Sequence, residues 1–350
     1  MRASPSPAPS PESPKPTGPT SGSPTSGSHT PDRPSPGGPP AGGPPKGRTA
    51  KGGSPKGRRG RSPWRRFEPL LWLGPAILLI ALVVLWPVVE MVRSSFLRIR
   101  RTGVVKGSNG FDNYQKLFDE PDFGHVLRNT LVWVVFVVAI TLVLSLGLAQ
   151  LFNQQFPGRR AARWALIIPW AASVFMTAVV FRWMLHHSRG VINTLLVDLH
   201  VIDKGEDWLG KPETAFPWMI AVAVFVSLPF TTYTLLAGLQ TIPADVYEAA
   251  RMDGASKWRT YLSVTLPLLR PAILVAVVIN LINVFNSFPI IWAMTGGGPG
   301  YQTDTTTTFM YKLKSTDIGE SAAMSVVNFG LIIVLVLVYL RVSRWNKETD

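Results

Sequence analysis

The stretch that decides the organisation of this chain is Glu248-Ala249-Ala250-Arg251-Met252-Asp253-Gly254-Ala255, which continues through Ser256 to Leu266-Pro267. It is the only long segment of polar and small residues between two strongly apolar runs, and each of those runs is long enough to cross a membrane. The rest of the chain is therefore expected to hold this loop, at about residues 241–270, in place.

The loop is predicted to fold as two short helices joined by a glycine turn. An early proline and an acidic residue in the first turn predict a helix from Pro243 to Met252. Gly254 supplies a backbone that is free to turn, and Ser256 is expected to cap a second helix. Pro267 is expected to end that second helix.

Two interpretations of the first helix follow from its residues. Ala249 and Ala250 are small where a loop usually carries larger polar residues. Small residues would let another protein surface approach the backbone closely, which makes the helix a docking element. The same pattern also fits amphipathic helices that lie on the membrane surface, and the residues alone leave both interpretations open.

Six apolar runs predict an all-α integral membrane protein with six transmembrane helices, because a span needs about 20 apolar residues. The expected spans are residues 69–92, 131–151, 165–185, 216–239, 272–294 and 322–340. Together they define a predicted transmembrane domain over residues 67–350, with the 241–270 loop on its cytosolic side.

Residues 1–66 are predicted to form a disordered, basic, cytosolic tail rich in Pro, Gly and Ser. Residues 1–63 contain 17 of the 31 prolines, and such a segment cannot bury enough apolar surface to offset its ordering entropy. The tail carries 12 Lys and Arg against two acidic residues, so most of the formal net charge of +14 lies there. Basic residues beside a membrane span are typical of anchoring at anionic lipid, so membrane lipid, and not nucleic acid, is the expected partner.

The distribution of Lys and Arg predicts the orientation of the chain. Basic residues gather in the tail, between the second and third spans, around the 241–270 loop and at the C-terminal end, all of which are expected in the cytosol. The first outer segment runs against this rule with Arg98, Arg100, Arg101 and Lys106. The balance predicts a multi-pass protein of the plasma (inner) membrane with both termini cytosolic.

No pattern in the sequence indicates a catalytic or metal site. The chain has no cysteine and five scattered histidines, which do not form a metal-ligand set. The acidic residues of the outer segments have no spacing that distinguishes a catalytic pair from solvated loop charge. The glycine-rich run at residues 296–299 lacks the lysine of a phosphate-binding loop, so it predicts a turn at the outer surface and no cofactor on this chain.

The fifth predicted span carries a polar stripe. Asn280, Asn283 and Ser287 fall within about 60° of one another on a helix, whereas Asn286 lies off that face. Polar groups in hydrocarbon are costly, so the stripe is expected to face protein or a water-filled path. Hydrogen bonds between helices and contacts to a polyol in transit both remain open.

Several of these segments together resemble a known family. Glu248-Ala249-Ala250, Asp253-Gly254-Ala255 and Leu266-Pro267 resemble the EAA loop of the permease subunits of ATP-binding-cassette (ABC) importers. The segments Phe285-Asn286-Ser287-Phe288, Ile291-Trp292 and Thr295-Gly296-Gly297-Gly298-Pro299 resemble the carbohydrate-type branch, which includes the maltose and glycerol-phosphate permeases. The resemblance extends from about Phe67 to the end of the chain and implies the type I importer permease fold.

The resemblance also implies a function and a set of partners. The chain is expected to be the permease subunit of a binding-protein-dependent importer of a sugar or related polyol, and not an enzyme. The implied partners are a pair of ATP-binding subunits that hold ATP and Mg, a second permease subunit and an extracytoplasmic solute-binding protein. Glu248 and Asp253 would make polar contacts to the ATPase, while Ala249, Ala250 and Gly254 would allow close approach.

Two other functions remain as alternatives at this point. A stand-alone secondary transporter would need internal repeats and charged residues near mid-membrane, which are not evident in the sequence. A membrane enzyme that uses the acidic outer segments is the less favoured alternative.

Overall fold

The computed structural model describes residues 68–345, which form a helical bundle with one small β-hairpin. The predicted tail at residues 1–66 lies outside the described residues. The first part of the bundle consists of α1 (Glu68–Ile80), a π-helical turn (Ala81–Leu85), α2 (Trp86–Ser95), β1 (Leu97–Ile99), β2 (Val105–Ser108), α3 (Asp112–Asp119) and α4 (Phe123–Asn153).

The rest of the bundle contains two further long helices and several short ones. The middle part consists of α5 (Arg159–Trp170), α6 (Val174–Met184), α7 (Val191–Asp198), α8 (Pro212–Gln240), α9 (Ala244–Met252) and α10 (Lys257–Thr260). After a π-helical turn (Tyr261–Thr265) come α11 (Leu266–Leu268), α12 (Arg270–Phe285), α13 (Phe288–Met294), α14 (Thr306–Lys314) and α15 (Ile318–Trp345).

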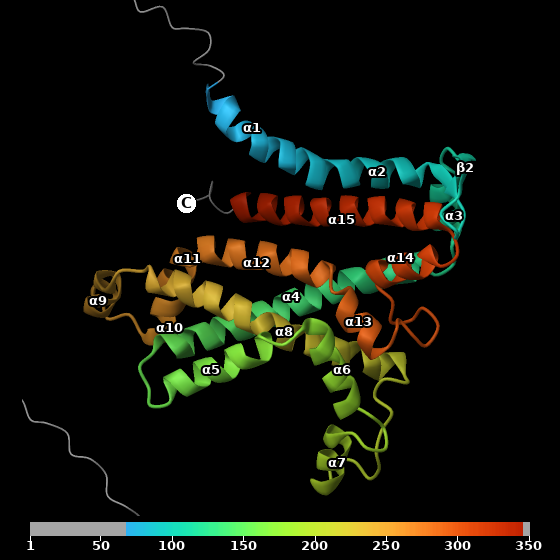
Figure 1. The fold of residues 1–350 in the computed structure, drawn as a ribbon. Helices are drawn as coiled ribbons and strands as arrows, with labels where there is room; N and C mark the ends of the chain where they lie inside the picture. The colour runs from blue at the N-terminus through green and yellow to red at the C-terminus, as the bar shows by residue number, and fades with distance from the viewer. Residues whose placement is uncertain (1–67, 346–350) are drawn as a thin grey trace, which may run out of the picture. The chain divides into compact units, whose positions relative to one another are not determined.

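Four helices in the described part of the chain are long and apolar enough to cross a membrane: 73–95, α4, α8 and 318–343. They confirm the first, second, fourth and sixth predicted spans. A fifth is obtained if the bent pair of residues 257–268 and 270–285 counts as one span. Figure 1 shows α2 alongside α15, with α9 and α10 at the opposite end of the long helices from α3 and the hairpin.

The third and fifth predicted spans are not continuous helices. Residues 165–185 divide into α5 and α6, because the backbone of Ser173 is extended and starts a new helix as its N-cap. Residues 272–294 divide into α12 and α13 around Asn286 and Ser287. Pro289 lies in the first turn of α13, where its missing N–H costs no helical hydrogen bond.

The β-hairpin was not predicted by the all-α assignment. Its strands are antiparallel, with Leu97 opposite Ser108 and Ile99 opposite Val105. The buried side chain of Asn113 fixes the hairpin to α3, because its Nδ2 donates to the carbonyl oxygens of Ser95 at 2.8 Å and Leu97 at 3.0 Å. This anchor depends on contacts between distant residues, which hydropathy does not reveal.

The main apolar core gathers side chains of α4, α6, α8, α12 and α13 around Trp133, which is fully buried. Trp133 also satisfies the break between α12 and α13, because its Nε1 donates to the carbonyl oxygen of Val284 at 3.0 Å and to Oγ of Ser287 at 2.8 Å. Broken helices are tolerated in membranes where neighbouring groups supply such hydrogen bonds. A second core joins the ends of α4 and α8 to the start of α12, beside the 241–270 loop.

Candidate coupling loop and translocation path

The turn after α9 is fixed by local backbone hydrogen bonds. Gly254 adopts a left-handed backbone with φ of 73°. The N–H of Gly254 donates to the carbonyl of Arg251, and the N–H of Ala255 donates to the carbonyl of Ala250, both at 3.0 Å. This is the Schellman arrangement that closes a helix when glycine follows the C-cap. The predicted helix, with Pro243 as its N-cap, and the predicted glycine turn are both confirmed.

The second helix of the loop begins as predicted and ends later than predicted. Oγ of Ser256 accepts a hydrogen bond from the N–H of Arg259, which caps α10. Pro267 does not end the helix, because the chain continues through a π-helical turn and α11 to Leu268. Pro267 lies in the first turn of α11, a position that tolerates proline. The bend of 67° comes between Leu268 and Arg270.

The predicted docking residues divide into an outward and an inward group. Glu248, Ala249, Asp253 and Gly254 are exposed, and a Cβ added at Gly254 would meet no atom within 4 Å. Ala250 is 8% exposed and packs inward, so it does not offer the outward surface that its neighbour does. The remaining loop residues, Ala255, Leu266 and Pro267, are half-buried.

The loop is held where α8 and α12 approach each other closely. A Cβ built on Gly238, near the end of α8, would lie 2.4 Å from Cβ of Ala272 in the first turns of α12. Only glycine therefore fits at this crossing, and it brings together the helix that enters the loop and the helix that leaves it. This contact leaves little room for the two helices to move independently of each other.

The predicted polar stripe of the fifth span does not form one face. Asn280 and Ser287 are buried, whereas Asn283 is exposed. The prediction assumed a continuous helix, but α12 ends at Phe285, so Ser287 follows a break and stands at the N-cap position of α13. Ser287 bonds to Trp133, and the Nδ2 atom of Asn280 is buried without a hydrogen-bond partner.

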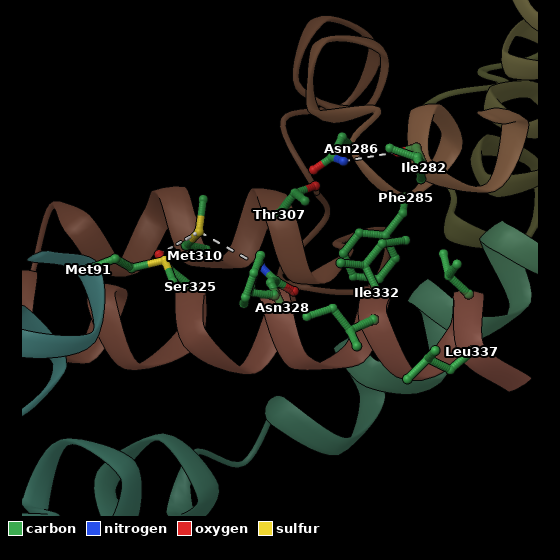
Figure 2. Close-up of a pocket in the computed structure, with 13 residues that line it drawn as sticks. Met91, Ile282, Phe285, Asn286, Thr307, Met310, Ser325, Asn328, Ile332 and Leu337 are labelled. Atoms are coloured by element: carbon green, nitrogen blue, oxygen red, sulfur yellow. Dashed lines mark hydrogen bonds between the residues drawn. The ribbon is translucent and has the colours of Figure 1, made fainter. Parts of the chain in front are cut away.

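A cavity of about 640 Å³ lies between α2, α12, α14 and α15. Figure 2 shows the side chains that line it, with Asn286 and Thr307 on one side and Ser325 and Asn328 on α15. Most of the remaining wall is apolar, including Phe285. An apolar cavity with a few convergent polar groups is the usual form of a site for a small molecule.

Asn328 is a polar residue of this wall whose side chain is almost fully buried. It is 8% exposed, and its Nδ2 donates to the carbonyl of Thr306 at 3.3 Å. Its Oδ1 atom is buried and has no hydrogen-bond partner. An unpaired buried carbonyl oxygen is costly, so this atom lowers the stability of the contact between α14 and α15.

The comparison with known proteins decides the family. A family model described as "binding-protein-dependent transport system inner membrane component" matches residues 141–347, which is more than half of the chain. The chain belongs to this family. The permease is 41% identical over 286 residues to a probable ABC transporter permease of Brucella suis, covering 81% of this chain and 99% of the relative.

Two further comparisons support the assignment. The permease is 38% identical to the sulfoquinovosyl glycerol transport system permease of Agrobacterium fabrum, covering 80% of this chain and 91% of the relative. Its fold matches a chain in the crystal structure of a bacterial ABC transporter involved in the import of the polysaccharide alginate. That match has a TM-score of 0.69 and 24% identity, and covers 80% of the permease and 98% of the other chain.

These findings confirm the predicted family, the helical membrane-permease fold and the transport function. The permease is a multi-pass inner membrane component of a binding-protein-dependent ABC importer and not an enzyme. Neither the stand-alone transporter nor the membrane enzyme gains support from any of the comparisons.

Sequence reasoning missed four polar residues of the cavity: Asn286, Thr307, Ser325 and Asn328. Asn286 was placed off the polar face because α12 was taken as continuous. Asn328 had a usable signal, since an asparagine within the apolar run of the sixth span is costly unless it has a role. The cavity itself had no such signal, because four separate elements enclose it.

A buried ion pair fixes the segment between α13 and α14. Nζ of Lys312 donates to Oδ2 of Asp304, whose side chain is fully buried, and lies 4.7 Å from the ring centroid of Tyr301. Burial raises the pKa of the Asp304 carboxyl above its usual value, and the hydrogen bond from Lys312 opposes that rise. Nδ2 of Asn129 also donates to the carbonyls of Gln302 and Asp304, which joins this segment to α4.

Proposed function

We propose that the permease forms half of a transport path for a sugar or related polyol, with the cavity beside Asn286 and Asn328 as part of that path. The convergence of Asn286, Thr307 and Ser325 in an otherwise apolar wall carries the proposal, because amide and hydroxyl groups can hydrogen-bond to the hydroxyls of a polyol. The Agrobacterium fabrum relative, by its name, transports a sugar glycoside, which agrees with this substrate class.

The second part of the proposal concerns how ATP hydrolysis drives transport. A pair of ATPase subunits, which bind ATP and Mg, docks on α9 through Glu248, Ala249, Asp253 and Gly254. Closure of that pair moves α9 as a rigid body, and the contact of Gly238 with Ala272 passes the movement to α12. The far end of α12 is Phe285 in the cavity wall, so the movement changes access to the cavity.

A second permease subunit would complete the path, and an extracytoplasmic binding protein would deliver the substrate. Purification of the transporter from its native membrane in mild detergent tests these partners directly. The expected result is co-purification of an ATPase, a second permease and a binding protein, which is then screened for sugar binding. A chain that purifies alone would contradict the proposed assembly.

Cysteine crosslinking tests the docking surface, because the native chain has no cysteine. Ala249→Cys is expected to crosslink to the ATPase, and its buried neighbour Ala250→Cys serves as the matched control. Equal crosslinking from the two positions, or none from Ala249→Cys in an active transporter, would contradict docking on this face of α9.

Labelling with a membrane-impermeant maleimide tests the proposed orientation, in which both termini and the 241–270 loop are cytosolic. Ser108→Cys on β2 is expected to react from outside intact cells, whereas Ser263→Cys in the loop is expected to react only after permeabilisation. Both positions are exposed in the structure. Reversal of the pattern would invert the orientation.

A further inference from the structure

A second cavity, of about 370 Å³, lies where α4 gives way to α5. Gln155, Phe156, Gly158, Arg159 and Arg160 line it. The proposed coupling loop and transport path use none of these residues. Two adjacent arginines in the wall of one cavity are suited to bind a phosphate group, because guanidinium groups match its geometry in bidentate hydrogen bonds.

These two arginines have no compensating charge nearby in the chain. From Phe123 to Val197 the sequence contains no Asp and no Glu. Within residues 68–345, no ion pair joins Arg159 or Arg160. In addition, Nε of Arg159 is buried without a hydrogen-bond partner. The positive charge of the two side chains is therefore not neutralised by a carboxylate within the described residues.

Arg163, one turn further along α5, differs from its neighbours. Its Nη2 donates to the carbonyl of Phe152 at 2.8 Å, and its own carbonyl accepts from the hydroxyl of Tyr233 at 3.1 Å. Arg163 therefore joins α5 to α4 and α8, whereas Arg159 and Arg160 remain available to a ligand. Nε of Arg163 is also buried without a partner, but its other contacts hold it between the helices, and it does not line the cavity.

The surface of α5 indicates what kind of phosphate compound would bind. Trp164 and Ile168, four residues apart on one face, are 63% and 65% exposed. Such a face is suited to contact acyl chains, and the basic cavity at the start of the same helix is suited to contact the headgroup. Phosphate and acyl chains together are the features of a phospholipid.

We propose that this cavity binds the phosphate group of an anionic phospholipid, whose acyl chains follow Trp164 and Ile168 along α5. The assignment to the cytosolic leaflet rests on the orientation given under the proposed function. The binding site itself does not depend on that orientation. Basic residues near the membrane surface attract anionic headgroups, and a cavity formed by the α4–α5 connection adds a defined position to that attraction.

The test measures phosphatidylglycerol binding to the purified, delipidated transporter by native mass spectrometry, with phosphatidylcholine as the neutral comparison. Arg159→Gln with Arg160→Gln is expected to weaken phosphatidylglycerol binding about 10- to 30-fold, since each basic residue near a headgroup contributes appreciably. The matched control is Arg100→Gln with Arg101→Gln, two adjacent exposed arginines beside the hairpin turn. Unchanged binding in the first double variant, or an equal loss in the control, would overturn the proposal.

A charge-preserving variant guards against misfolding or altered insertion. Arg159→Lys with Arg160→Lys keeps the basic residues that orient the chain and removes the planar fork, so binding is expected to fall only several-fold. If the lysine variant inserts normally and loses no affinity relative to wild type, recognition by paired guanidinium groups is wrong.

Competition with soluble phosphate separates the two possible sources of the ligand. Inorganic phosphate and glycerol phosphate at equal concentration are expected to displace little phosphatidylglycerol, because they lack the acyl chains. If either soluble compound displaces phosphatidylglycerol with an affinity equal to that of the lipid, the cavity binds a soluble phosphate compound and the lipid proposal is overturned. The ATPase that co-purifies is scored in the same samples, so loss of lipid with the ATPase retained is distinguished from failure of the proposed assembly.

Discussion

Exchange of the two small residues where α8 crosses α12 tests whether this contact holds the coupling loop. In Gly238→Ala the new Cβ lies 2.4 Å from Cβ of Ala272, which is about 1 Å short of ordinary carbon–carbon contact. Overpacking of this kind costs about 1–3 kcal/mol. The better helix propensity of alanine returns about 0.5–1 kcal/mol, so a net loss of stability is expected.

The reverse change at the partner position provides the compensating variant. Ala272→Gly alone is expected to cost about 0.5–1 kcal/mol through helix propensity. In the double variant the methyl group has moved from one helix to the other, so the overlap with Ala272 is gone. Leu269 Cδ1, 2.9 Å from the added Cβ, is the end of a flexible side chain and can shift. The coupling energy between the two substitutions is therefore expected to be favourable by about 1–3 kcal/mol.

The measurements are thermal unfolding of the purified transporter and substrate uptake after reconstitution. Gly238→Ala is expected to lower both the midpoint of unfolding and the uptake per ATP hydrolysed, and the double variant is expected to restore both. Additive losses of stability in the double variant would refute close packing at this crossing. Restored stability with uptake still lost would refute its role in transmission.

Three further predictions concern the loop, the ion pair and the cavity. Gly254→Trp is expected to abolish uptake in a protein that still inserts. The control is Gly103→Trp, which imposes the same backbone strain at an open position in the hairpin turn and is expected to leave uptake intact. Normal uptake by Gly254→Trp would contradict docking at this turn. Lys312→Met is expected to lower the free energy of unfolding by about 3–5 kcal/mol, because it leaves Asp304 buried and unpaired. Thermal unfolding checks this, with the exposed Lys314→Met as the control, and the loss of stability is expected to shrink as the pH falls and Asp304 takes up a proton. Asn328→Leu is expected to change thermal stability little, because it removes an unpaired buried oxygen together with the hydrogen bond to the carbonyl of Thr306. It is expected to reduce uptake several-fold, and normal uptake would exclude this side chain from the path.

The sequence alone determined those features that depend on local chemistry or on composition. The Schellman turn at Gly254 and the cap at Ser256 were predictable, because each involves residues no more than five positions apart. The long apolar runs predicted four of the membrane spans, since the bilayer selects helices by length and hydropathy. The EAA resemblance predicted the family, because all of its residues lie within one short segment, 248–267.

Only the tertiary structure decided the features that combine distant segments. The helix break at Asn286 is stabilised by Trp133, which lies more than 150 positions earlier in the chain. The break removes Ser287 from the face of α12 and places Asn286 in the cavity wall, while the packing of α12 buries Asn280 and leaves Asn283 exposed. The close contact of Gly238 with Ala272 likewise depends on how two helices cross. Periodicity describes one helix at a time, whereas the path and its link to the loop are made by the packing of several.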